Sequence, residues 1–212
     1  MVRRFAIITE ADARQIEYGA TVELSAGGHV TPLARDTLRE RRVTVVPAGT
    51  VDPALPPDLA PTADIRRVAI ASDHTGIALR KAMVQHLRGR GVAVEEFGPA
   101  DGTPADYPDT AAAVANAVAR GEADAGIAID GAGIGSAIAA NKVRGIRAVM
   151  CPDETIARYS REHNGANVIT FGSTLMPTDQ ALRILDIWLA TPMKEPRYIR
   201  RLLKIRRLEE QR

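Results

Sequence analysis

The sequence predicts an α/β protein built on a parallel sheet that helices cover on both faces. From Arg66 onward, short apolar segments alternate with segments whose apolar residues recur at a helical period. The short segments are continuously apolar, which is typical of parallel strands buried on both faces. Aromatic residues make up only 4% of the chain, so Ala, Val, Ile and Leu must fill the core.

Five strands, each followed by a helix, are expected in this part of the chain. The expected strands are 66–72, 92–98, 125–130, 146–151 and 167–172. The expected helices are about 75–88, 109–121, 134–142, 153–162 and 178–192. A last, basic helix is expected to begin near Pro196. The alternation predicts right-handed crossovers between parallel strands.

A proline-rich segment, PAGTVDPALPPDLAP, divides the chain. It can hold neither a helix nor a central strand, so residues 47–65 are predicted to form a semi-rigid linker. The linker separates a small N-terminal extension, residues 1–46, from a main domain, residues 66–212. The extension is too short for a convincing core of its own, so we expect it to pack on the main domain or on a partner.

The composition excludes several classes of protein. The formal net charge of +2 gives no reason to expect a nucleic-acid partner. Cys151 is the only cysteine, which excludes disulfide frameworks and thiolate zinc sites and favours a reducing compartment. No apolar run approaches the roughly 20 residues of a membrane span, and the one near Met1 is too short for a signal peptide. We therefore expect a cytoplasmic protein with no membrane partner.

Residues that can carry chemistry follow the strands, and the carboxyl ends of parallel strands form the ligand-binding edge of such sheets. Asp73 and His74 follow the first strand, Tyr107 lies in the loop after the second, and Asp130 ends the third. A loop with three alternating glycines comes next: Gly131, Gly133 and Gly135. Carboxylates and a histidine are thereby predicted to converge on one edge.

The glycine loop has the features of an anion site, because glycine lets backbone N–H groups approach a ligand and a helix N-terminus follows. A phosphate or an enediolate oxyanion would suit it. Its G-x-G-x-G spacing differs from the dinucleotide-binding G-x-G-x-x-G, and no suitably placed acid lies about 20 residues further on. We therefore expect no nicotinamide and no other cofactor.

Two roles are open to Asp130. As a helix N-cap it would accept backbone amides of the next turn, for which Asp is a favoured residue. As a general base it would lie in a dry, glycine-lined pocket, where desolvation would raise its pKa toward the working pH.

Other candidates also have structural alternatives. Asp73 and His74 could be a cap and a surface histidine, and Cys151 could be a small core residue. Arg197 and Arg201 could belong to the solvated face of a basic helix.

The position of His163 and Asn164 predicts an assembly. The pair could simply end a helix before Gly165. Because they precede the fifth strand, however, they lie within one subunit at the opposite edge of the sheet from Asp130. A single site that used both edges would need a second subunit, which predicts an obligate dimer.

From about Arg66 to Arg212, the chain resembles the type B ribose-5-phosphate isomerases and their galactose-6-phosphate isomerase relatives. Four blocks in the family's order carry the resemblance: VAIASDHTGIALRKAMVQHL, ADYPDTA, GAGIGSAIAANKVRGIRAVMC and SREHNGANVITFGS. The resemblance implies an aldose–ketose phosphate isomerase that needs no metal, folded as a Rossmann-like three-layer α/β/α sandwich. It also implies a homodimer, or a tetramer built from it, with sites shared between subunits.

The resemblance assigns roles to residues at matching positions. Asp73 would hydrogen-bond substrate hydroxyls and assist ring opening, and His74 would contact the phosphate. Tyr107 would line the pocket, and Gly131 to Gly135 would form the anion-holding loop.

Four further positions match the family at the other edge of the sheet. His163 and Asn164 match a pair that promotes ring opening and binds substrate oxygens. Arg197 and Arg201 match phosphate-binding arginines of the C-terminal helix.

The chain departs from the family pattern at three places. The family's base is a cysteine at the position of Asp130 or a glutamate at that of Ser136, so neither usual base is present. Ala132 replaces a frequent threonine or serine, and Thr174 replaces an arginine that commonly binds phosphate. We expect Asp130 to act as the base in the cysteine's place.

The leading functional expectation is conversion of ribose 5-phosphate to ribulose 5-phosphate through a cis-enediol, with Asp130 moving the proton between carbons 2 and 1. Two alternatives stay open. One is an isomerase of a different small phosphorylated sugar, and the other is a non-catalytic binding or assembly subunit with this fold.

The N-terminal segment VELSAGGHVTPLARDTLRERRVTVV resembles a short segment of bacterial microcompartment enzymes, chiefly through TPLARD. The resemblance implies a location inside such a compartment, with a shell or cargo protein as partner. Its structural alternative is a short amphipathic helix that Thr31 caps, that has Pro32 in its first position, and that ends at Arg42.

Overall fold

The computed structural model describes residues 3–48, 59, 63–193 and 196–211, with the side chains of 196 and 197 left out. The chain divides into two compact units, Met1–Pro56 and Pro57–Arg212. Most of the expected linker, residues 47–65, lies outside the described residues. Each unit is built around parallel strands and is described by itself.

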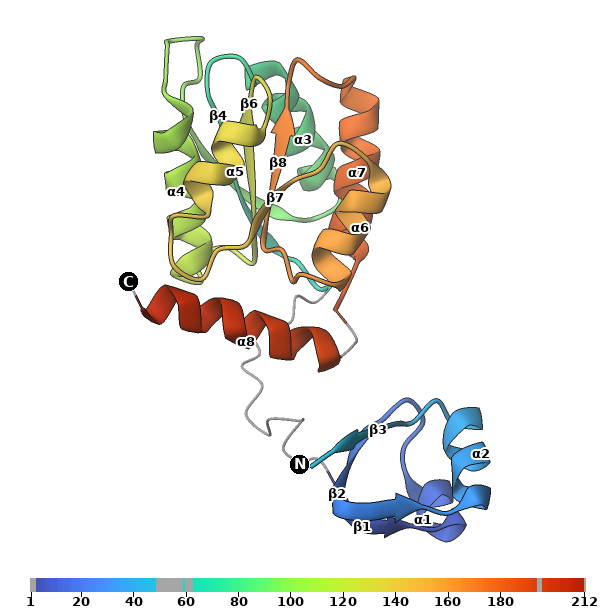
Figure 1. Cartoon of the computed structure of the whole chain (residues 1–212). Helices are drawn as coiled ribbons and strands as arrows, with labels where there is room; N and C mark the ends of the chain where they lie inside the picture. The colour runs from blue at the N-terminus through green and yellow to red at the C-terminus, as the bar shows by residue number, and fades with distance from the viewer. Residues whose placement is uncertain (1–2, 49–58, 60–62, 194–195, 212) are drawn as a thin grey trace. The chain divides into compact units, whose positions relative to one another are not determined.

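The first unit is a small β-α-β-α-β fold. Its elements are β1 Arg4–Ile8, α1 Glu10–Gln15, β2 Thr21–Val30, α2 Pro32–Glu40 and β3 Thr44–Pro47. The strands pair in parallel in the order β1-β2-β3, and both helices lie on one face of the sheet (Figure 1). Thr31 caps α2 as expected, because its side chain accepts the amide of Ala34, but the helix ends at Glu40 rather than Arg42.

This unit has a hydrophobic core of its own, so the expectation that the extension lacks one was wrong. The core residues come from β1, β2 and both helices, and they are Ile8, Ala13, Ile16, Val22, Ala34 and Leu38. Two short helices on one sheet face bury enough small and branched side chains to close a core within about 45 residues.

The second unit contains a five-stranded parallel sheet in the order β5-β4-β6-β8-β7. Its strands are β4 Arg67–Ser72, β5 Ala93–Phe97, β6 Ala125–Asp130, β7 Ala148–Met150 and β8 Val168–Gly172. Its helices are α3 Ile77–Gly89, α4 Tyr107–Ala119, α5 Ile134–Ala140, α6 Glu154–Glu162, α7 Thr178–Ala190 and α8 Pro196–Glu210. The predicted strands and helices are therefore present, although β7 is shorter than expected and α4 begins earlier.

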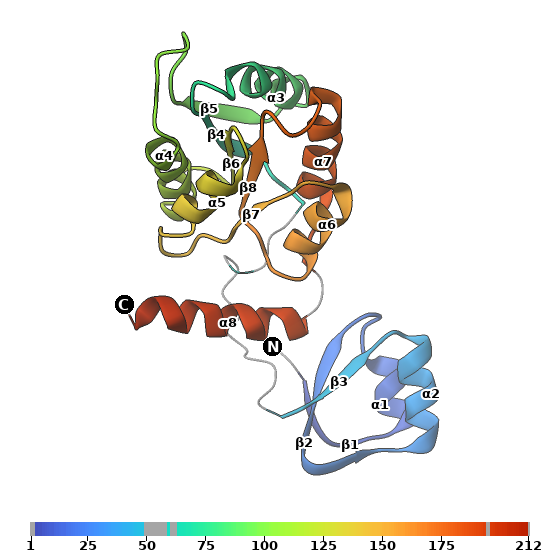
Figure 2. The same ribbon diagram turned by 45° about the horizontal axis from the view of Figure 1, so that its top comes forward.

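Two helical layers cover the sheet, as predicted. Helices α4 and α5 lie on one face and α3, α6 and α7 on the other (Figures 1 and 2). The strands divide their side chains by size. Val68, Ile70 and Ile127 face the α3 side, whereas Ala69 and Ala71 face α4. Small residues on the second face let α4 pack closely on the sheet.

The strand order places a topological switch point at the carboxyl ends of β4 and β6. From β4 the chain first moves to β5 on one side and then returns to β6 on the other. Helices diverge at such a topological switch point, which leaves room for a ligand above the strand ends. Helix α8 lies at the other edge of the sheet, where Leu202 approaches Gly165 and the Glu209 carboxylate accepts the amide of Gly145. None of the described helices is long and apolar enough to cross a membrane.

Candidate active site

Asp73 follows β4 and Asp130 is the last residue of the neighbouring strand β6, at the switch point of the sheet. Ser72 of β4 pairs with Ile129 of β6 in the parallel ladder, so the two aspartates come next to each other at the same edge. Their side chains are almost fully buried, with 6% of Asp73 and 5% of Asp130 exposed. The predicted convergence of carboxylates at this edge is therefore present.

The Asp130 carboxylate accepts three backbone amides of the loop that follows it. Oδ1 accepts the N–H groups of Ala132 (2.8 Å) and Gly133, and Oδ2 accepts the N–H of Ser136 (2.8 Å) in the first turn of α5. Burial raises the pKa of Asp130, but the hydrogen bonds from Ser136, Gly133 and Ala132 outweigh it and hold the pKa below its usual value. The expectation of a raised pKa was wrong, because the loop supplies more donors than desolvation can offset.

Glycine is required at two places in this loop for steric reasons. Gly133 has a φ of 76°, and a Cβ there would lie 2.7 Å from the backbone of Phe171 in β8. A Cβ on Gly135 would lie 2.6 Å from the ring of Tyr107. At Gly131 a Cβ would have only an ordinary van der Waals contact, with the Thr75 hydroxyl at 3.9 Å.

The loop divides its amides between Asp130 and the open edge. Ala132, Gly133 and Ser136 donate to the carboxylate, whereas the N–H groups of Gly131, Ile134 and Gly135 have no acceptor among the described residues. Free amides at the start of a helix favour an anionic or carbonyl oxygen. The whole loop was expected to hold an anion, but only the amides of Gly131, Ile134 and Gly135 are left to do so.

Asp73, His74 and Tyr107 surround this edge. Oδ1 of Asp73 accepts the N–H (2.8 Å) and hydroxyl (2.6 Å) of Thr75 and the N–H of Gly76 (3.3 Å). His74 is exposed, and its Nδ1 accepts the amide of Ala105 at 3.4 Å. Tyr107 begins α4 and is 42% exposed, with its ring on Gly135.

His163 lies at the opposite edge, as its position in the chain predicts. It ends α6 shortly before β8 begins, and its ring stacks between Tyr159 (4.6 Å between centroids) and Tyr198 of α8 (4.7 Å). Asn164 beside it is exposed. The structure therefore brings Asp73, His74, Tyr107 and the glycine loop together, and it keeps His163 apart from them within one subunit.

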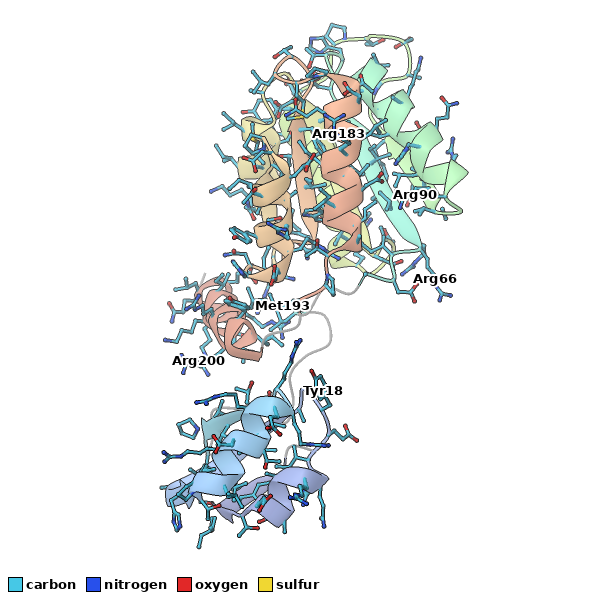
Figure 3. The ribbon with its side chains drawn as sticks, turned by 90° about the vertical axis from the view of Figure 1, so that its right-hand side faces the viewer. Tyr18, Arg66, Arg90, Arg183, Met193 and Arg200 are labelled. Carbon is cyan, nitrogen blue, oxygen red and sulfur yellow. The ribbon has the colours of Figure 1, made fainter. Side chains whose placement is uncertain are left out.

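The basic helix α8 carries the remaining predicted site residues. Arg201 is exposed, and its guanidinium lies 5.6 Å from the ring centroid of Tyr198. Arg200 of the same helix, labelled in Figure 3, is also exposed. The side chain of Arg197 lies outside the described residues.

Sequence reasoning missed Arg80, a buried arginine that holds the segment after β5. It is only 3% exposed, and its guanidinium donates to the carbonyls of Phe97 and Pro99, each at 2.6 Å. These bonds fix the start of the connection that leads to Tyr107. An arginine in the first turn of a helix looks like a surface residue in the sequence, so no signal marked it as buried.

Cys151 is a core residue, as its structural alternative proposed. It is fully buried, and burial raises the pKa of its thiol to about 12. Among the described residues, no group of three or more His, Cys, Asp or Glu side chains is placed to hold a metal ion.

A family model described as Ribose/Galactose Isomerase matches residues 68–205. The chain belongs to this family. All the matched residues lie in the second unit. The predicted family, its Rossmann-like fold and its isomerase class are therefore confirmed.

Relatives of known name extend this match. Ribose-5-phosphate isomerase B of Escherichia coli K12 is 42% identical over 148 residues, which cover 70% of this chain and 99% of the relative. The solved ribose-5-phosphate isomerase B of Clostridium thermocellum is 43% identical with a TM-score of 0.67, covering 68% of this chain and 98% of that one. The Mycoplasma genitalium enzyme, solved with bound ribulose-5-phosphate, is 37% identical with a TM-score of 0.65, covering 69% and 97%.

Proposed function

We propose that this isomerase interconverts an aldose phosphate and its ketose phosphate, with ribose 5-phosphate and ribulose 5-phosphate as its substrate pair. The observation that carries the proposal is that one short loop combines the Asp130 carboxylate, whose pKa is lowered, with backbone amides that have no acceptor among the described residues. A carboxylate can take a proton from carbon, and the amides can hold the oxygen on which negative charge develops. The names of the relatives support the same reaction.

The proposed reaction passes through a cis-enediol. Asp130 takes the proton from carbon 2 of the open-chain aldose, the C–H electron pair forms the carbon 1–carbon 2 double bond, and the former carbonyl oxygen gains negative charge. The N–H groups of Ile134 and Gly135 stabilise that oxygen. A proton then moves from the carbon 2 hydroxyl to that oxygen. The negative charge left on the carbon 2 oxygen forms the ketose carbonyl, and the electron pair of the double bond takes the proton back from Asp130 at carbon 1. Because its pKa lies below the usual value, the base is ready at neutral pH without a prior deprotonation.

A second subunit completes the proposed site. The turns after the five strands contain no lysine or arginine, and His74 is their only basic residue, so one subunit has too little positive charge here for a phosphate dianion. The proposal gives this task to Arg197 and Arg201, and ring opening to His163 and Asn164, all from the partner of a homodimer. Exposed Ile134 (55%) and Ile138 (57%) on α5 provide an apolar surface beside the site for such a partner.

A non-catalytic binding subunit is the second candidate, and one observation favours it. Both oxygens of Asp130 are engaged by the loop, as they would be if the residue only capped α5. A binding subunit would not exchange a carbon-bound proton with solvent.

The first unit is proposed to bind a shell or cargo protein of a bacterial microcompartment. Its own core supports a separate role, and Leu33 on α2 is 59% exposed and free to contact a partner. Deleting residues 1–60 should then disperse the protein through the cytoplasm of its native cell. Unchanged localisation would refute this role.

The test of the main proposal is isomerisation in deuterated water, followed by NMR. The wild-type protein should convert ribose 5-phosphate and place solvent deuterium on carbon 1 of the ribulose 5-phosphate formed. Tetrose and hexose phosphates tested alongside identify a different preferred sugar. No conversion and no deuterium incorporation with any of them would refute the isomerase and favour the binding subunit.

A further inference from the structure

Three hydroxyls from β8 and the turn after it donate to carbonyls of the glycine loop. Thr170 Oγ1 donates to the carbonyl oxygen of Gly133 at 2.6 Å. Ser173 Oγ donates to that of Asp130 at 3.1 Å, and Thr174 Oγ1 donates to that of Gly131 at 2.6 Å. We call Thr170, Ser173 and Thr174 the β8 hydroxyl residues.

The hydroxyl of Thr174 sets the direction of an amide that binds Asp130. The carbonyl of Gly131 and the N–H of Ala132 belong to one planar peptide unit and point in opposite directions. The backbone amide (3.1 Å) and hydroxyl of Thr174 hold the carbonyl toward β8. The N–H of Ala132 therefore points the other way and meets Asp130 Oδ1 at 2.8 Å.

The hydroxyl of Thr170 acts in the same way on the next free amide. Holding the carbonyl of Gly133 toward β8 turns the N–H of Ile134 away from the strand. That N–H has no acceptor among the described residues and is one of the two that we assign to the substrate oxygen. Thr170 is fully buried, and its hydroxyl donates to the carbonyl of Gly133.

Close packing keeps water from the hydroxyl of Thr170, which is fully buried, whereas Thr174 lies in an exposed turn. A Cβ on Gly133 would lie 2.7 Å from the Phe171 backbone, and one on Gly172 would lie 2.7 Å from that of Ala132. The loop and the end of β8 are therefore in direct backbone contact. Each carbonyl also accepts one backbone amide, that of Ala137 for Gly133 (3.3 Å) and that of Thr174 for Gly131 (3.1 Å). The hydroxyl supplies the shorter of the two hydrogen bonds at each carbonyl, so its loss weakens the hold on the peptide unit.

We propose that Thr170 and Thr174 are positioning residues for the isomerisation, each orienting one amide of the glycine loop. Thr174 directs the Ala132 amide to the base, and Thr170 directs the Ile134 amide to the substrate oxygen. The catalytic part of this inference rests on the proposed function. The two residues touch the loop and not the reacting atoms.

The test compares Thr174→Val with Thr174→Ser, and uses Thr178→Val, an exposed position at the start of α7, as the matched control. Thr174→Val keeps the shape but removes the donor. Its kcat should fall about tenfold with KM within about twofold, because misplaced transition-state groups affect kcat first. The acid limb of its kcat profile should move to higher pH, since the Ala132 hydrogen bond helps to lower the pKa of Asp130. Thr174→Ser should restore both values, and Thr178→Val should change neither.

Amide hydrogen exchange separates this inference from the proposed function. Exchange within residues 131–136 should be about tenfold faster in Thr174→Val and in Thr170→Val than in the wild type or the control. If the wild type isomerises no sugar phosphate, the proposed function fails, and the exchange result alone decides whether the hydroxyls orient the loop. Equal losses of kcat in Thr174→Val and Thr174→Ser, or unchanged exchange in both valine variants, would overturn the inference.

Discussion

Asp73 and Asp130 follow neighbouring strands, are buried alike and both bind the turn after them, yet they use their oxygens differently. The donors to Asp73 among the described residues all reach Oδ1, whereas the donors to Asp130 reach both oxygens. Under the proposed function, Oδ2 of Asp73 would accept a ligand hydroxyl. Asp130 accepts two amides at Oδ1 and one at Oδ2, which leaves its Oδ2 one further acceptor site. The same residue type at equivalent strand ends thus makes two different sets of hydrogen bonds, because the turns after the two strands offer different donors.

The largest expected effect comes from Asp130→Asn. Asparagine has the same shape but only one accepting oxygen, and it cannot take a proton at neutral pH. We expect kcat/KM for ribose 5-phosphate to fall by about 10²–10⁴ in a coupled assay of ribulose 5-phosphate. Asp186→Asn on α7, where the carboxylate pairs with His86 and Arg90 rather than with the loop, is the matched control and should keep wild-type activity. An active Asp130→Asn enzyme would mean that both aspartates are only caps.

The stability of the same variant should depend on pH in a defined direction. The pKa of Asp130 is lowered in the folded state, so its contribution to the free energy of unfolding is fully present above the unfolded value of about 3.9. It is lost as pH falls through the lower folded pKa. Urea unfolding should show the wild type about 1–3 kcal/mol more stable than Asp130→Asn at pH 7, with the difference shrinking below pH ~4. A difference that grows in acid would contradict the loop's hold on the carboxylate.

Asp73→Asn should have a smaller effect on stability and activity than Asp130→Asn, because one accepting oxygen is enough for the donors of Thr75 and Gly76. Asparagine caps a turn as well as aspartate does, so the free energy of unfolding should change by less than about 1 kcal/mol. Activity should fall about tenfold through the weakened contact with a substrate hydroxyl. A loss as large as that of Asp130→Asn, measured in the same assay, would erase the distinction between the two carboxylates.

Thr75→Val should have the smallest effect. The variant removes the hydroxyl that donates to Asp73 Oδ1 at 2.6 Å but leaves both backbone amides in place. A cost of about 0.5–1.5 kcal/mol in urea unfolding is expected for one hydrogen bond, with activity within about threefold of the wild type. If activity instead drops below that of Asp73→Asn, the Thr75 hydroxyl itself contacts the substrate.

Much of the second unit could be predicted from its sequence, since continuous apolar strands and turn residues specify a parallel sheet and its ligand-binding edge. The first unit was harder to predict from its sequence. Its two edge strands, β1 and β3, are short and largely exposed, so their pattern resembles loop sequence. Its core depends on both helices lying on one face of the sheet, which the sequence pattern does not specify.

Within the site, the residues were predictable and their directions were not. A carboxylate before three glycines indicates an anion loop, but whether its own side chain enters that loop depends on backbone torsions such as the left-handed Gly133. The contacts of Thr170 and Thr174 join segments about 40 residues apart. No local pattern encodes such a contact, because it depends on β8 lying beside β6.

The buried thiol has a practical consequence for spectroscopy. Cys151 is the only cysteine in the chain, and a pKa of about 12 with full burial leaves it protonated and out of reach of maleimide dyes at neutral pH. The natural protein therefore serves directly as a cysteine-free background. Cysteines introduced at exposed Tyr18 and Arg90 would carry a donor and acceptor dye on the two units, and energy transfer between them would report the separation of the units as sugar phosphate is added.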